Sequence, residues 1–83
     1  MSSRSELETM IEHEKRQTAL EYQHEAWAGG LSDGIDMEIM AEAAIATAIT
    51  ELVEMGGESV TLAYLDELRE QVIAGAFTAR TLQ

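Results

Sequence analysis

The chain contains one pair of residues whose spacing suits metal binding. Glu21 and His24 stand in a Glu-x-x-His arrangement within the stretch EYQHEAW, and on a helix this spacing places both side chains on one face. Helical metal sites of the carboxylate type combine such a motif with glutamates from facing helices, and Glu38 and Glu42 could take that role if the chain folds back. Those sites repeat the motif, whereas this chain contains it once, so a second copy would have to complete the set. A histidine among solvated glutamates is the simpler interpretation, and we expect no bound metal or other cofactor.

Other signatures of catalysis are missing from the sequence. The chain has no cysteine, which excludes disulfides and thiolate chemistry. It has no Gly-x-Ser-x-Gly motif, and neither of its two Gly-Gly pairs is followed by the lysine of a phosphate-binding loop. We therefore expect that the protein is not an enzyme.

The charge balance is strongly acidic. Sixteen Asp and Glu residues against five Lys and Arg residues give a formal net charge of −11 at pH 7. This charge repels nucleic acid and anionic membranes and favours a basic protein, such as a DNA-binding protein. The N-terminal stretch MSSRSELETM lacks the apolar region of a signal peptide, and the apolar run near 39–49 is too short to span a bilayer. We expect a cytoplasmic protein that binds neither membranes nor nucleic acid directly.

Glycines and capping residues divide the 83 residues into predicted helices. Ser5 begins a capping box with Glu8, and Asp36 is placed to cap a second helix. Gly29-Gly30 and Gly56-Gly57 are predicted to end the first and second helices. The predicted helices cover about 5–28, 37–55 and 59–74, and a frayed tail follows at 75–83. The prediction is a small all-α domain of three helices that spans 1–83.

The predicted central helix is apolar on most of its circumference. One of its stripes contains Ile45, Ile49, Leu52 and Val53, and the other contains Met37, Met40, Ala44, Ala48 and Met55. Such a helix has to be covered on more than one side. Two neighbouring helices could supply this cover, and so could a second copy of the chain, so a homodimer is an open alternative.

Apolar residues suited to protein contacts gather around the predicted turn at 31–36. The predicted contact residues are Trp27, Leu31, Met37 and Met40, and the acidic residues that would steer association are Glu25, Asp33 and Glu38. Tryptophan is enriched in binding hot spots, and methionine adapts to partners of varied shape. An apolar centre with an anionic rim fits a basic partner. The alternative is that Trp27, Leu31 and Ile35 close the core at this corner, and both interpretations can hold for different residues.

The segment EYQHEAWAGGLSDGIDMEIMAEAAIATAITELVEMGG, about half of the chain, resembles the QseM group of small antiactivators from quorum-sensing-controlled conjugative elements. The resemblance lies in the overall pattern of a short, acidic, cysteine-free helical protein. It implies binding to transcriptional activators, including LuxR-type regulators, and silencing of excision and transfer genes. The resemblance carries over no site residues.

The expected function is that of a non-enzymatic acidic regulator that binds and inhibits a DNA-binding transcriptional activator. Two alternatives of other classes stay open. One is a DNA mimic that inhibits a nucleic-acid enzyme, and the other is a metal-binding helical bundle built on Glu21 and His24. A self-associating structural protein is a further alternative.

Overall fold

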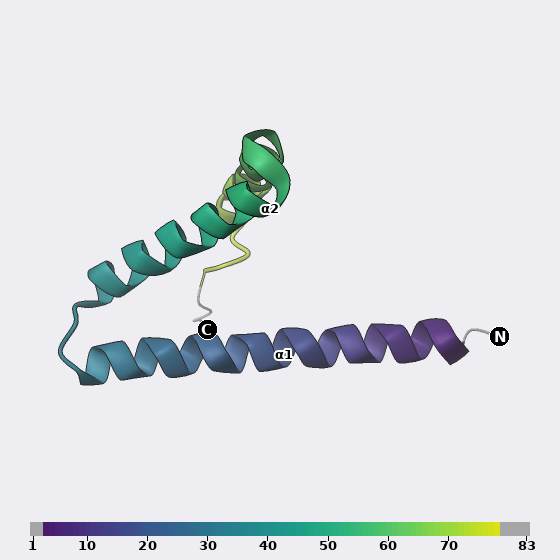
Figure 1. The fold of residues 1–83 in the computed structure, drawn as a ribbon, viewed down its shortest axis with the longest axis horizontal. Coiled ribbons are helices and arrows are strands. Elements are labelled where there is room, and N and C mark those ends of the chain that lie inside the picture. The colour runs from purple at the N-terminus through teal and green to yellow at the C-terminus, as the bar shows by residue number, and fades with distance from the viewer. Residues whose placement is uncertain (1–2, 79–83) are drawn as a thin grey trace. The chain divides into compact units, whose positions relative to one another are not determined.

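The computed structural model describes residues 3–78, and this part of the chain contains two helices and no strand. α1 covers Ser3–Ser32 and α2 covers Met37–Ile73 (Figure 1). The prediction of an all-α protein is confirmed. The prediction of three helices is wrong, because the second and third predicted helices form one element that is bent at Gly57.

The C-terminus of α1 lies beyond the two glycines that were predicted to end it. The helix ends instead in a Schellman motif, in which Ile35 N–H donates to the Gly30 carbonyl and Gly34 N–H donates to the Leu31 carbonyl, both at 3.0 Å. Gly34 has a φ of 86°, the left-handed conformation that this motif requires. A glycine inside a helix lowers its stability without ending it, so the residue able to reverse the backbone decides where α1 stops.

The N-terminus of α1 also differs from the prediction. α1 already includes Ser3, so Ser5 lies inside the helix and the predicted capping box of Ser5 and Glu8 is wrong. The Ser5 carbonyl accepts a hydrogen bond of 2.9 Å from the Thr9 hydroxyl.

The start of α2 agrees with the prediction. Met37 is its first residue, which places Asp36 at the N-cap position. Met40 N–H donates to the Asp36 carbonyl at 3.0 Å, as expected for the first main-chain bond of a helix.

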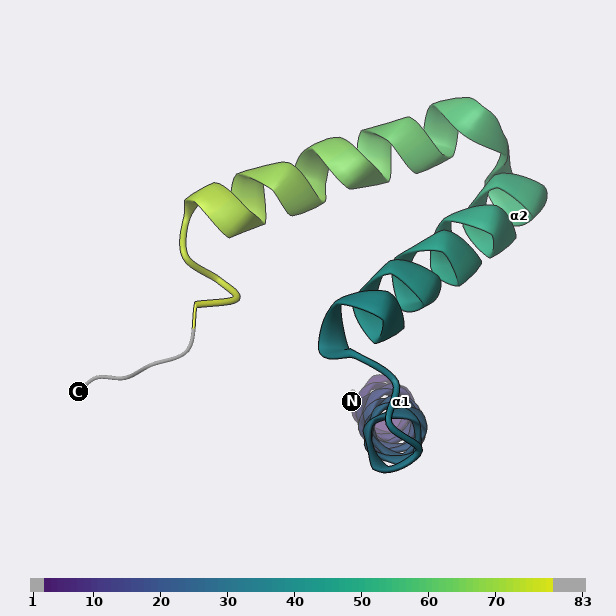
Figure 2. The same cartoon turned by 90° about the vertical axis from the view of Figure 1, so that its left-hand side faces the viewer.

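Gly57 bends α2 and separates two helical segments (Figure 2). Its φ of 86° and ψ of 173° define a conformation that is essentially restricted to glycine. The predicted break at Gly56-Gly57 is therefore in the right place, but it is a kink of one residue. The Thr61 hydroxyl donates to the Gly57 carbonyl at 2.9 Å and supports the first turn after this kink.

The chain divides into two compact units, one up to Glu42 and the other from Ala43. The first unit contains α1 and the first residues of α2. The second contains the rest of α2, on both sides of the kink, and the turn after it. α2 ends at Ile73, and the turn after it contains Gly75, which has a positive φ. In this turn Ala76 N–H donates to the Gln71 carbonyl at 2.9 Å. The single domain expected over 1–83 stays a prediction, and the part of the expected frayed tail at 79–83 lies outside the described residues.

Neither unit buries an apolar side chain within residues 3–78. In this range Thr61 is the buried residue, with 3% of its surface exposed. The half-buried side chains of the second unit belong to Ile49, Leu52, Val53, Leu65 and Leu68, from both sides of Gly57. Ile49, Val53 and Leu65, from both sides of Gly57, line one groove. Large apolar side chains elsewhere on both helices stay exposed.

Candidate interaction surfaces

The turn between α1 and α2 joins the two helix ends that carry the apolar residues predicted to bind a partner. We call this surface the unit 1 corner and define it by Trp27, Leu31, Met37 and Met40. The thioether of Met40 lies against the backbone of Gly30, where a Cβ would be only 2.6 Å from Met40 Cε. Glycine at position 30 therefore permits the close approach of the two chain segments at this corner.

The four residues of the unit 1 corner divide into two pairs by their burial. Trp27 and Met40 are half-buried, so they help to close the turn. The alternative interpretation proposed this role for Trp27, but also for Leu31 and Ile35, which are exposed. Leu31 and Met37 are exposed, with 39% and 59% of their surfaces accessible. The exposed pair is the part of the corner that a partner can contact directly.

Acidic residues stand next to the unit 1 corner in the sequence. Glu25, Asp33 and Glu38, the residues predicted to steer association, are all exposed. Asp33 has a fixed backbone, because its N–H donates to the carbonyls of Gly29 and Gly30 at 3.0 and 3.1 Å. The neighbouring Asp36 adds a fourth carboxyl group. The corner thus combines exposed apolar groups with negative charge.

The Glu-x-x-His pair lies on the exposed surface of α1. Within the described residues, no three or more histidine, aspartate and glutamate side chains come together in a way that could hold a metal ion. Glu38 and Glu42 therefore do not complete a site with Glu21 and His24 inside one chain.

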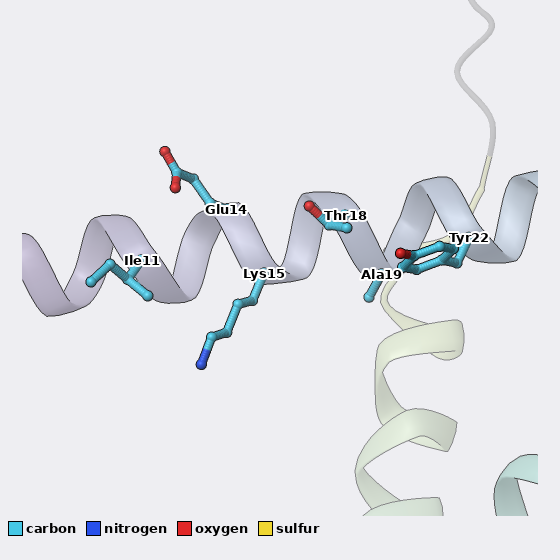
Figure 3. Close-up of a pocket in the computed structure, with 6 residues that line it drawn as sticks. All are labelled: Ile11, Glu14, Lys15, Thr18, Ala19 and Tyr22. Carbon is cyan, nitrogen blue, oxygen red and sulfur yellow. The ribbon is translucent and has the colours of Figure 1, made fainter.

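The middle of α1 carries a shallow depression formed by one helix alone (Figure 3). It is lined by Ile11, Glu14, Lys15, Thr18, Ala19 and Tyr22. Figure 3 shows Glu14 and Lys15 pointing to opposite sides of the helix, with Ile11 before them along the helix and Ala19 and Tyr22 after them. The depression is a helical surface with no second wall, so it offers contact area and no enclosed site for a small molecule.

A second apolar surface, which the sequence pattern did not predict, lies between the two segments of α2. We call it the unit 2 groove and define it by its lining residues: Ile49, Val53, Glu58, Thr61, Leu62 and Leu65. The first stripe of the predicted central helix contains two of these residues, Ile49 and Val53. The signal that could have revealed the groove is that apolar residues stand on both sides of Gly56-Gly57, with Leu62 and Leu65 after the two glycines.

Within the described residues, no helix is both long enough and apolar enough to cross a membrane. Comparison of the chain with protein-family models, with curated proteins and with solved structures finds no match.

Proposed function

We propose that this protein is a non-enzymatic regulator that binds a basic, DNA-binding transcriptional activator and blocks its action. The observation that carries the proposal is that no apolar side chain between residues 3 and 78 is buried. A small chain with this much exposed apolar surface is stabilised when another protein covers it. The formal net charge of −11 favours a basic protein for that role.

The unit 1 corner is the surface that we assign to the activator. Leu31 and Met37 supply exposed apolar contact, and Trp27 and Met40 support them from a half-buried position. Apolar groups at the centre of an interface supply most of its affinity, while charges at its rim mainly raise the association rate.

The resemblance of the central half of the chain to the QseM group agrees with this proposal. The resemblance implies control of excision and transfer genes through binding to transcriptional activators. We assign the same role here, in the cytoplasm, with LuxR-type regulators as the first partners to test.

The direct test uses the purified DNA-binding activators encoded beside the gene of this protein. We expect one of them to bind the protein by isothermal titration calorimetry and to lose activity in a transcriptional reporter assay. The variant Met37→Gln should weaken binding about tenfold, because it places a polar group in the apolar centre. The control is Met55→Gln, which changes a methionine that is 78% exposed and lies outside the corner, and which should leave binding unchanged.

A second pair of variants tests the acidic rim. The triple variant Glu25→Gln, Asp33→Asn, Glu38→Gln should slow association more than the control Glu51→Gln, Glu54→Gln, Glu67→Gln, although both remove three charges. The proposal is wrong if no activator binds and reporter expression stays unchanged when the protein is overproduced. Equal effects of the two triple variants would contradict the assignment of the activator to the corner.

A further inference from the structure

The unit 2 groove has two walls and a fixed base. One wall is the segment of α2 before Gly57 and the other is the segment after it (Figure 2). The groove has a volume of about 290 Å³, and Glu58 and Thr61 are the polar residues among the six that line it. Its lining side chains include one that is largely exposed, so the groove suits the apolar side chains of another protein better than an enclosed small molecule.

The base of the groove is built by the kink. Gly57 takes a conformation that other residues avoid. The Thr61 hydroxyl donates a hydrogen bond of 2.9 Å to the Gly57 carbonyl. Ile49, Val53 and Leu65, which line the groove, are half-buried. The groove is therefore formed before any partner arrives, which lowers the entropic cost of binding.

Leu62 is the apolar group that the groove leaves most open. It lines the groove while 62% of its surface remains exposed. An apolar side chain placed against Leu62 and Val53 would remove both from water.

The charges around the groove are almost all negative. Between residues 43 and 78 the second unit contains six Asp and Glu residues and one Arg, a formal net of −5. Glu58 lines the groove, and Asp66 lies one helical turn after Leu62. Arg69, the one basic residue in the range 43–78, lies one turn after Leu65 and forms an ion pair of 3.4 Å with Glu70. This charge favours a basic occupant and opposes a second copy of the chain, which carries the same sign.

We propose that the unit 2 groove binds an amphipathic helix of a basic protein. The apolar face of that helix inserts along Leu62 and Val53, and its Lys or Arg residues lie near Glu58 and Asp66. A helix is the fitting element because the groove runs between two helices and the described residues offer no strand edge for an extended peptide. This inference rests on the proposed function for the basic character of the partner, and it adds a second contact surface to the unit 1 corner.

The test uses a synthetic helical peptide of 18 residues, with leucine at positions spaced i, i+3, i+4 and i+7 and lysine elsewhere, titrated into the full chain. NMR chemical shifts of Ile49, Leu62 and Leu65 should move together and saturate. Leu62→Gln should weaken binding about tenfold, whereas Val72→Gln should change it less than twofold. Val72 is the matched control, because it is also 62% exposed on the same helical segment but does not line the groove.

Both variants keep the net charge, so a general attraction between a basic peptide and an acidic protein would affect them equally. A peptide with glutamate in place of lysine should show at least tenfold weaker binding. Equal loss in the two variants, or equal binding of the glutamate peptide, overturns the proposal. It is also overturned if sedimentation shows a dimer that Leu62→Gln dissociates, or if nuclear Overhauser effects in the free chain place α1 side chains on Leu62.

The two proposals fail in different ways. If an activator binds with full affinity to Leu62→Gln and the peptide does not reach the groove, the groove proposal is wrong and the proposed function stands. If the peptide binds in the groove but no activator binds the protein, the groove proposal stands and the proposed function is wrong.

Discussion

At the scale of single residues, the hydroxyl of Thr61 contributes more than its small size suggests. It donates to the carbonyl of Gly57 at 2.9 Å in a position that is 3% exposed. Thr50 makes the same type of bond, to the carbonyl of Ala46 at 2.8 Å, in an exposed position. A hydrogen bond away from water stabilises more than one in contact with it, since losing the buried bond leaves a carbonyl without its partner.

We predict that Thr61→Val lowers the free energy of unfolding by about 1 kcal/mol, while Thr50→Val changes it by less than about 0.5 kcal/mol. Valine has the shape of threonine, so the comparison isolates the hydroxyl group. Urea unfolding followed by circular dichroism at 222 nm measures both values. Equal values for the two variants would show that the hydrogen bond at the kink stabilises the protein no more than the exposed one does.

The two adjacent glycines of α1 have different surroundings, which gives a second residue-scale prediction. A Cβ at Gly29 would meet nothing within 4 Å, whereas one at Gly30 would lie 2.6 Å from the mobile end of Met40. Gly29→Ala should stabilise the chain by up to about 1 kcal/mol, through helix propensity alone. Gly30→Ala should gain less or lose stability, because Met40 has to leave the corner. Thermal unfolding of both variants checks this order, and a larger gain for Gly30→Ala would contradict it.

At the scale of elements, the sequence predicts the approximate positions of the helix interruptions better than it predicts the backbone conformation of each glycine there. All four glycines at 29, 30, 56 and 57 look alike in the sequence, yet of these only Gly57 has a positive φ. Gly29 and Gly30 stay helical because Gly34, five residues after Gly29, takes the conformation that ends α1. Backbone angles of this kind depend on contacts between segments, which a pattern along one chain does not contain.

The same reason explains how much of the candidate surfaces could be predicted. The unit 1 corner was accessible from sequence, since its residues lie close together along the chain. The unit 2 groove was not, because Ile49 and Leu62 are brought to one surface by the direction of the kink. The partial burial of Trp27 and Met40 likewise depends on the approach of Met40 to Gly30.

The kink itself provides the prediction at this scale. Gly57→Ala should lower the free energy of unfolding by about 1–3 kcal/mol, because a Cβ opposes the backbone conformation at this position. A Cβ at Gly57 would meet nothing within 4 Å, so the cost is one of backbone angles and not of space. The variant should also weaken nuclear Overhauser effects between Ile49 and Leu62. The control is Gly29→Ala, because the φ of Gly29 is not positive. This variant should leave these effects intact.

At the scale of the whole molecule, two global properties act together. The chain has no buried apolar side chain between residues 3 and 78, and it has a net charge of −11. The first property lets a partner stabilise the protein by covering apolar surface, and the second determines which partner approaches fastest. Exposed charges are screened over about 10 Å at 0.1 M salt, whereas apolar contacts are not weakened by salt.

This difference in salt response gives the last prediction. The association rate with the proposed basic activator should fall at least tenfold between about 0.05 M and 0.5 M sodium chloride, while the dissociation rate changes little, because screening acts mainly on the approach of charged surfaces. Surface plasmon resonance measures both rates. The triple variant Glu25→Gln, Asp33→Asn, Glu38→Gln should show a weaker salt dependence, whereas Met37→Gln should show the full dependence with faster dissociation. An association rate independent of salt would mean that the acidic surface does not guide the partner, and affinity would then rest on the apolar contacts of the unit 1 corner alone.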